Sequence, residues 1–171
     1  MFEDPSELNA TDARAFLDEA RQAEDPNKRR RFMAASVYFA IAAYETAWER
    51  GHDNAAKKTI KAEAGRLLPH YALLHDVRIH NFHRNPLPAA NPRMLVAWVG
   101  PSVATPGVMT SLLNSDQRVG GSGRPVTMKT TAVGLELHDR DGDVWVTLDA
   151  AIERFLGGLP AFLQAVHPLI R

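Results

Sequence analysis

Residues 28–50 read KRRRFMAASVYFAIAAYETAWER. Apolar or small side chains recur every three or four positions on two sides of this stretch, one side through Met33, Val37, Ile41, Tyr44 and Trp48, the other through Phe32, Ser36, Phe39 and Ala43. A helix that is apolar on two sides is typical of the centre of a helical protein. We therefore expect a central helix here, with alanines that let neighbours approach closely and Gly51 as its stop.

Three further stretches have helical spacing and surround the central one. They cover residues 6–23, 54–68 and 69–84, and the last begins with Pro69, which suits the first turn of a helix. Beyond Pro92 the pattern changes to runs typical of strands. We expect strands at 94–99, 126–137 and 144–148, a loop at 114–125, an Asp141–Gly142 hairpin turn, and a final helix capped by Asp149 that glycines and Pro160 kink or split.

These elements predict a mainly α (α+β) fold. We expect an antiparallel bundle of four to five helices, with a small antiparallel β-sheet inserted before the C-terminal helix. The whole chain, residues 1–171, is expected to be one domain. Within it, residues 6–88 form the bundle, 93–148 the strand-rich segment, and 149–171 a helix that packs on the bundle.

Composition narrows the classes of function. The 171 residues include no cysteine, which excludes thiolate metal sites and cysteine nucleophiles. No apolar run has the length of a membrane span and no signal peptide is recognisable, so we expect a cytoplasmic protein. The 20 basic and 20 acidic residues balance, but they are segregated along the chain. Residues 1–27 hold eight acids against two bases, whereas residues 28–93 hold twelve bases against five acids.

Four of the seven histidines fall in one short stretch: His70, His75, His80 and His83. Asp76 and His80 are four residues apart, so they share a helix face and the carboxylate could orient the imidazole. A solvated polar helix face explains the cluster equally well. A third interpretation is a metal-binding or small-molecule enzyme around His75, His80 and His83. We predict no metal and no cofactor, because the chain lacks an HExxH pair.

Other motifs are weaker. Asp139, Asp141 and Asp143 resemble a calcium loop but lack its glycine and its closing glutamate. The glycines at 120–123 lack the lysine of a phosphate loop, and no serine lies in a GxSxG elbow. The basic run at 28–31 could contact phosphates, or it could be a solvated run that pairs with the acidic first helix.

The segment RIHNFH, residues 78–83, has the form Arg, four residues, His near the end of the predicted bundle. Together with the alanine- and aromatic-rich stretch at 38–48, it resembles the HEPN superfamily of small helical domains. The resemblance covers residues 6–88 and extends to the closing helix.

The resemblance implies a metal-independent endoribonuclease that acts as a homodimer, with two Arg/His motifs meeting in one cleft. In that case Arg78 is the phosphate ligand and His83 the general acid/base, with His80 and Asn81 beside them. RNA contacts are expected from Lys28, Arg29, Arg30 and Arg84. The alternative is a non-catalytic HEPN-like protein that binds a protein partner, dimerises or has an antitoxin-like role.

Overall fold

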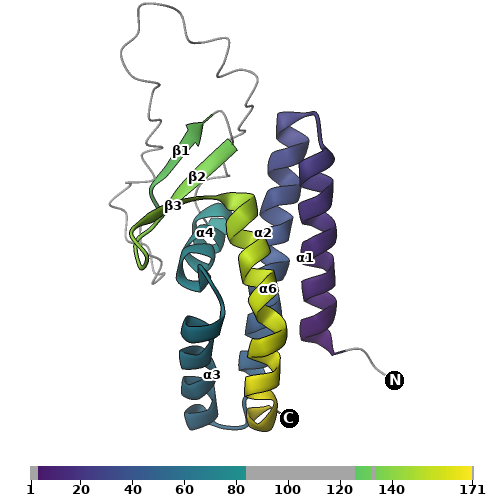
Figure 1. Cartoon of the computed structure of the whole chain (residues 1–171). Helices are drawn as coiled ribbons and strands as arrows, with labels where there is room; N and C mark the ends of the chain where they lie inside the picture. Colours follow the sequence, from purple (N-terminus) through teal and green to yellow (C-terminus); the bar gives the residue numbers. More distant parts are fainter. Residues whose placement is uncertain (1–3, 84–125, 132–133, 171) are drawn as a thin grey trace, which may run out of the picture.

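A computed structural model of the chain describes residues 4–83, 126–131 and 134–170, apart from the side chains of residues 80–83 and 130. The helices are α1 (Pro5–Gln22), α2 (Pro26–Glu49), α3 (Asn54–Leu67), α4 (Tyr71–His83) and α6 (Leu148–Val166), which runs into a short 3₁₀ helix (His167–Leu169). The strands are β1 (Met128–Thr131), β2 (Gly134–Asp139) and β3 (Val144–Thr147), directly before α6 (Figure 1). The predicted fold class, a helical bundle with a small antiparallel sheet before the last helix, is confirmed.

Helices α1 and α2 begin in the same way. An aspartate precedes each helix, and a proline is its first residue. Proline suits this position because the first turn of a helix needs no backbone N–H donor. The carboxylates of Asp4 and Asp25 accept the backbone N–H groups of Ser6 and Asn27, at 2.8 and 2.9 Å. The connection between Gln22 and Pro26 is short, and α2 returns alongside α1 (Figure 1).

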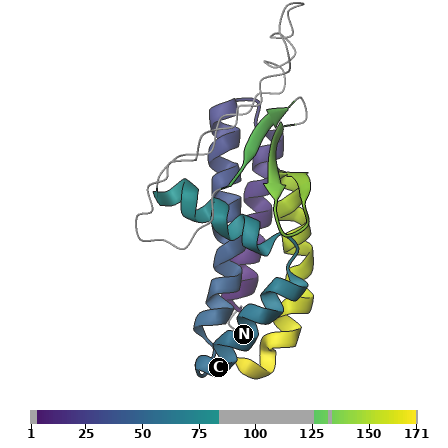
Figure 2. The same ribbon diagram turned by 90° about the vertical axis from the view of Figure 1, so that its left-hand side faces the viewer.

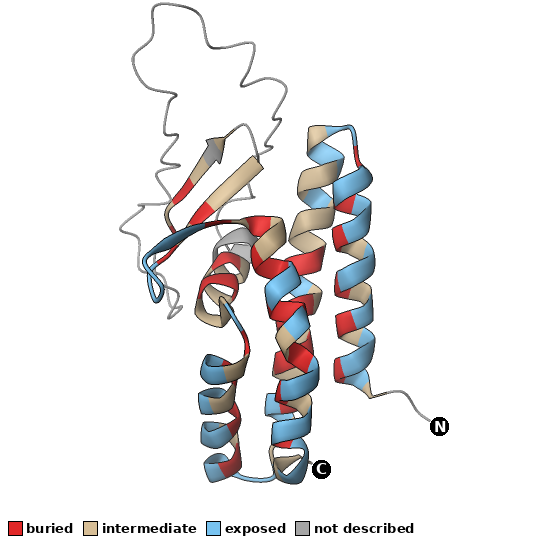
Figure 3. Cartoon of the chain, in the orientation of Figure 1, coloured by how far each residue is buried: buried red, intermediate tan, exposed pale blue. Residues whose placement is uncertain are grey.

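Helix α2 is the centre of the molecule, as its two apolar sides predict. Helix α1 runs along one side of it, α6 packs against both α1 and α2, and α4 crosses α2 on the side away from α1 instead of running beside it (Figures 1 and 2). The buried residues face inward between these helices (Figure 3). The largest fully buried side chains include Ile41 of α2, Ile60 of α3, Leu74 of α4, and Phe155 and Phe162 of α6.

The predicted start of the fourth helix at Pro69 is wrong, because α4 begins at Tyr71. The preceding residue, His70, has φ of 59°, in the left-handed region that a continuing helix does not use. Its ring Nδ1 lies 2.5 Å from the Oδ2 atom of Asp139 in β2, and both side chains are 10% exposed. A long-range polar contact therefore ties the junction of α3 and α4 to the sheet.

The single strand predicted at 126–137 is also wrong, because the segment forms the hairpin of β1 and β2. Thr131 pairs with Gly134, so only two residues connect the strands, and Gly134 has φ of 129°, which favours glycine. The predicted hairpin at Asp141–Gly142 is confirmed, with Asp139 opposite Val144. The strand predicted at 94–99 and the loop predicted at 114–125 lie outside the described residues.

Helix α6 is continuous from Leu148 to Val166, so its glycines and Pro160 do not split it. Thr147 precedes its first residue, and Asp149 lies in the first turn, so the predicted cap at Asp149 is wrong. Pro160 has no N–H to donate to the carbonyl of Leu156, four residues earlier. The guanidinium of Arg14 in α1 donates to this carbonyl at 3.1 Å, and it supplies the hydrogen bond that the proline removes.

Candidate functional site

The polar residues nearest the predicted motif gather where α4 crosses α2. The Arg78 guanidinium forms an ion pair with the carboxylate of Glu45, and its Cζ atom lies 5.0 Å from the centre of the Tyr38 ring. The Arg78 side chain is 22% exposed and Tyr38 is exposed. The predicted phosphate ligand is thus held at the protein surface by a carboxylate and an aromatic ring, both from α2.

Two tyrosines lie near Glu45, Tyr44 from α2 and Tyr71 from α4. The rings of Tyr44 and Tyr71 meet edge to face at 4.8 Å, and the Tyr44 hydroxyl donates a hydrogen bond to that of Tyr71. Burial first, and then the hydrogen bond to Tyr71, raise the pKa of Tyr44 above its ordinary value of 10.0. The pKa of Tyr71 is raised as well, again mainly by burial, so both hydroxyls stay neutral. The two tyrosines therefore join α2 to α4 without adding charge.

His75 lies next to Tyr71, one turn before Arg78 on α4. Its ring centre is 6.0 Å from that of Tyr71. Burial lowers the pKa of His75 below its ordinary value of 6.5, and the cations Arg78 and Lys61 act in the same direction. The carboxylates of Asp76 and Glu45 oppose this shift but do not outweigh it. The imidazole is therefore neutral near pH 7 and able to accept a proton.

The other residues of the predicted motif occupy the last turn of α4. His80, Asn81 and His83 belong to the helix, but their side chains lie outside the described residues, as does Arg84 altogether. The helix runs through Asn81 without a break. At about 100° per residue, positions 78 and 83 are about 140° apart around its axis. One copy of α4 alone does not bring these two positions to one side.

The predicted basic run lies at the beginning of α2. Arg29 donates two hydrogen bonds, 3.2 and 2.8 Å long, to the carbonyl of Ala23, and so closes the turn between α1 and α2. Lys28 is exposed, with its ammonium 5.5 Å from the centre of the Phe32 ring, and Arg30 is half-buried. This gives Arg29 a structural role, whereas Lys28 remains accessible to a ligand.

Sequence reasoning missed both of these partners of Arg78. Tyr38 was counted only in the alanine- and aromatic-rich stretch at 38–48, and Glu45 was given no role. A signal for Glu45 was present, because it is the only charged residue between positions 32 and 47. An isolated carboxylate in an apolar helix needs a cationic partner, and Arg78 is that partner. Arg31, exposed and seven residues before Tyr38, lies on nearly the same side of α2 and extends the basic surface about 10 Å along it.

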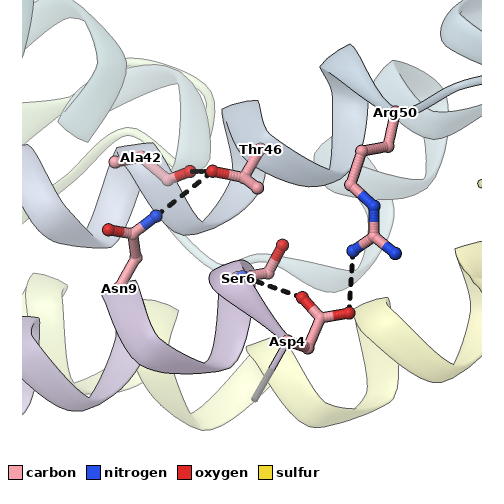
Figure 4. Close-up of polar contacts among 6 residues, drawn as sticks. All are labelled: Asp4, Ser6, Asn9, Ala42, Thr46 and Arg50. Atoms are coloured by element: carbon pink, nitrogen blue, oxygen red, sulfur yellow. Dashed lines mark hydrogen bonds and ion pairs between the residues drawn. The ribbon is translucent and has the colours of Figure 1, made fainter. Parts of the chain in front are cut away.

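A second polar cluster joins the beginning of α1 to the end of α2 (Figure 4). Arg50 pairs with Asp4 at 2.8 Å, and the side-chain amide of Asn9 donates to the hydroxyl of Thr46 at 3.1 Å. The side chains of Arg50, Asp4, Asn9 and Thr46 therefore have partners within the protein. They fasten the open end of the α1–α2 hairpin, so we assign them a structural role.

A groove of about 720 Å³ lies between α1 and α6, lined by residues that include Glu7, Arg14, Leu163 and His167. Of the predicted site residues whose side chains the structure describes, none lines it. Among the residues that the structure describes, no group of three or more histidine, aspartate or glutamate side chains could hold a metal ion. Likewise, no helix in the described ranges has the length and apolar character needed to cross a membrane.

Comparison of the chain with protein-family models, with curated proteins and with solved structures found no match. The function of the site must therefore be argued from its own chemistry.

Proposed function

We propose that the chain is an HEPN-like RNA-binding protein that cleaves RNA without a metal, acts as a homodimer, and works in the cytoplasm. The observation that carries the proposal is the state of Arg78. It combines a fixed guanidinium with a partly exposed surface position, in the helix that ends with His80, Asn81 and His83. A guanidinium has five N–H donors in a planar fork, so Glu45 can fix it while other donors remain for a phosphate.

The chemistry needs only side chains of this kind. The ribose 2′-hydroxyl attacks the adjacent phosphorus, a histidine transfers protons near neutral pH, and a guanidinium stabilises the charge that develops on the phosphate oxygens. By the resemblance, His83 is the proton-transferring group and Arg78 the phosphate ligand. Their separation of about 140° around α4 favours a site shared between two copies of the chain.

Charge also supports an RNA ligand. Helix α1 carries four of the eight acids of the first 27 residues, and it packs on the side of α2 that faces away from α4 (Figures 1 and 2). The acidic helix therefore does not cover Arg78. Arg31 and Lys28 add positive charge along α2. An RNA strand that has one phosphate bound to Arg78 could continue along α2 and place further phosphates near these two side chains.

The test is cleavage of end-labelled RNA in the presence of EDTA. We expect the wild-type chain to cleave, and Arg78→Ala to lower the rate about 10²–10³-fold, the usual cost of losing one donor to a developing oxyanion. Arg66→Ala is the matched control, because Arg66 is an exposed arginine on α3 that pairs only locally with Glu63. It removes the same charge and should cleave as the wild type does.

The same assay examines the dimer. His83→Ala should be inactive, and a mixture of Arg78→Ala with His83→Ala should regain activity, because a mixed dimer contains one intact shared site. Absence of cleavage by the wild type, or cleavage by His83→Ala at the wild-type rate, would contradict the catalytic proposal.

A non-catalytic interaction protein is the second candidate, and one observation favours it. The ion pair with Glu45 already neutralises Arg78, which is how a purely structural arginine is held. In that case RNA would bind without cleavage, or not at all. If the chain binds RNA without cleaving it, and the binding weakens steeply with salt, the chain is an RNA-binding module. If it does not bind RNA at all, the ligand of this surface is a protein.

A further inference from the structure

His75 and Arg78 are neighbours on the surface of α4. They are three residues apart, a spacing that places side chains next to one another on a helix, whereas Arg78 and His83 lie on different sides. Both His75 and Arg78 interact electrostatically with Glu45 of α2. The histidine that the described residues bring to the fixed guanidinium is therefore His75, which lies outside the Arg-x4-His motif.

The surroundings of His75 suit a base. Its ring contacts Tyr71, which holds it in place, and it is half-buried, so it is neither locked in the core nor free in solvent. The charged groups around it are Glu45 from α2, Lys61 from α3, and Asp76 and Arg78 from α4. Burial and the two cations keep the imidazole neutral at pH values where a fully exposed histidine would be partly protonated.

We propose that His75 is the general base of the RNA cleavage proposed above, an inference that rests on that function. A phosphate bound by Arg78 places the adjacent ribose within reach of a side chain one helical turn away. The assignment separates two tasks that the motif alone gives to a single histidine. His75 accepts a proton, and His83 is left to donate one.

A ring nitrogen of His75 takes the proton of the 2′-hydroxyl while the 2′-oxygen forms a bond to phosphorus. The bond from phosphorus to the 5′-oxygen breaks, and this oxygen receives a proton from His83 of the second copy, the group to which the resemblance gives proton transfer. The products are a 2′,3′-cyclic phosphate and a free 5′-hydroxyl, and proton exchange with water returns both histidines to their starting states.

The experiment measures RNA cleavage in EDTA over a range of pH with wild-type protein, His75→Gln and His75→Ala. His167→Gln is the matched control, because His167 is an exposed histidine at the end of α6. We expect both His75 variants to cleave about 10²–10⁴-fold more slowly while binding RNA with unchanged affinity. The control should cleave like the wild type.

The pH profile separates a base from a structural residue. For the wild type the rate should fall with decreasing pH only below 6.5, because the pKa of His75 is lowered from that value. The His75 variants should lose this dependence, and added imidazole should restore activity to His75→Ala.

The outcomes are distinct. If the wild type does not cleave RNA, the proposed function fails and this inference fails with it. If the wild type cleaves and His75→Gln cleaves equally well, or keeps the acidic limb of the pH profile, only the role of His75 is overturned. Slow cleavage by His75→Ala that imidazole does not restore also overturns it.

Discussion

Glu45 determines what Arg78 can do. Its carboxylate is the only charged group between positions 32 and 47, and it meets the guanidinium where α4 crosses α2. The two side chains are 31% and 22% exposed, so solvent screens the pair and its contribution to stability is small. The main effect of Glu45 is positional, because it fixes the direction of the planar group that would receive a phosphate.

His75 makes a prediction for stability as well as for catalysis. Its pKa in the folded protein is lowered from 6.5, so the unfolded chain takes up a proton first as the pH falls. Stability should therefore be unaffected by His75 above about pH 7 and should decrease as the pH falls below 6.5. Urea denaturation as a function of pH measures this, and His75→Gln should remove that part of the dependence.

Asp4 titrates at a lower pH than the range in which His75 affects stability. Burial alone would raise the pKa of Asp4, but hydrogen bonds from Arg50 and from the Ser6 backbone outweigh burial and lower it below 3.8. The stability that Asp4 contributes is present above that value and is lost only as the pH falls below it. An identical pH dependence for the wild type and His75→Gln between pH 6.5 and 3.8 would contradict the assignment.

At the scale of elements, the sequence predicts the first three helices within about two residues, because apolar periodicity is a local signal. The errors have non-local causes. His70 leaves the helix because it contacts Asp139 of β2, far away along the chain. The hairpin of β1 and β2 was missed because its turn has no Asn-Gly or Asp-Gly signal: Gly134, which the turn requires, is the first residue of β2.

Two adjacent glycines of α6 should respond oppositely to substitution. A Cβ at Gly158 would clash with the carbonyl oxygen of Leu67 and lie 3.0 Å from Pro69, whereas a Cβ at Gly157 meets nothing within 4 Å. Gly158→Ala should destabilise the protein by about 1–3 kcal/mol, since the backbone of α3 must move away. Gly157→Ala should stabilise it by up to about 1 kcal/mol, because alanine favours the helix.

Thermal and urea denaturation of the two variants test the packing of α6 against the end of α3. Each variant serves as the control for the other, because both add one methyl group to the same turn. Equal effects of the two substitutions on the free energy of unfolding would show that α6 does not approach α3 at Gly158.

For the whole molecule, the distribution of charge matters more than its sum. The equal numbers of acidic and basic residues argue against a nucleic-acid ligand only if the charges are mixed. Helix α1 holds its acids on the side of α2 away from α4, and its Arg21 pairs with Glu153 of α6 at 2.9 Å. A neutral chain can therefore present a positive surface along α2 and α4.

The sequence predicts the class of fold, but not the crossing of α4 over α2. Periodicity shows which residues of a helix are buried, not the direction in which two helices cross. For that reason Arg78 could be proposed from a motif, whereas Tyr38 and Glu45 could be joined to it only after the helices were placed.

The most direct test is an NMR titration of the isotope-labelled protein in EDTA with a short oligoribonucleotide whose 2′-hydroxyls are methylated, so that it can bind but cannot be cleaved. The account predicts that the largest shifts fall on the Arg78 guanidinium, the His75 ring, and the amides of Tyr38 and Glu45. Signals of Arg66 on α3 and of Arg14 in the groove between α1 and α6 should stay unchanged. Shifts centred on that groove, or no shifts at all, would contradict the assignment of the α2–α4 crossing as the RNA site.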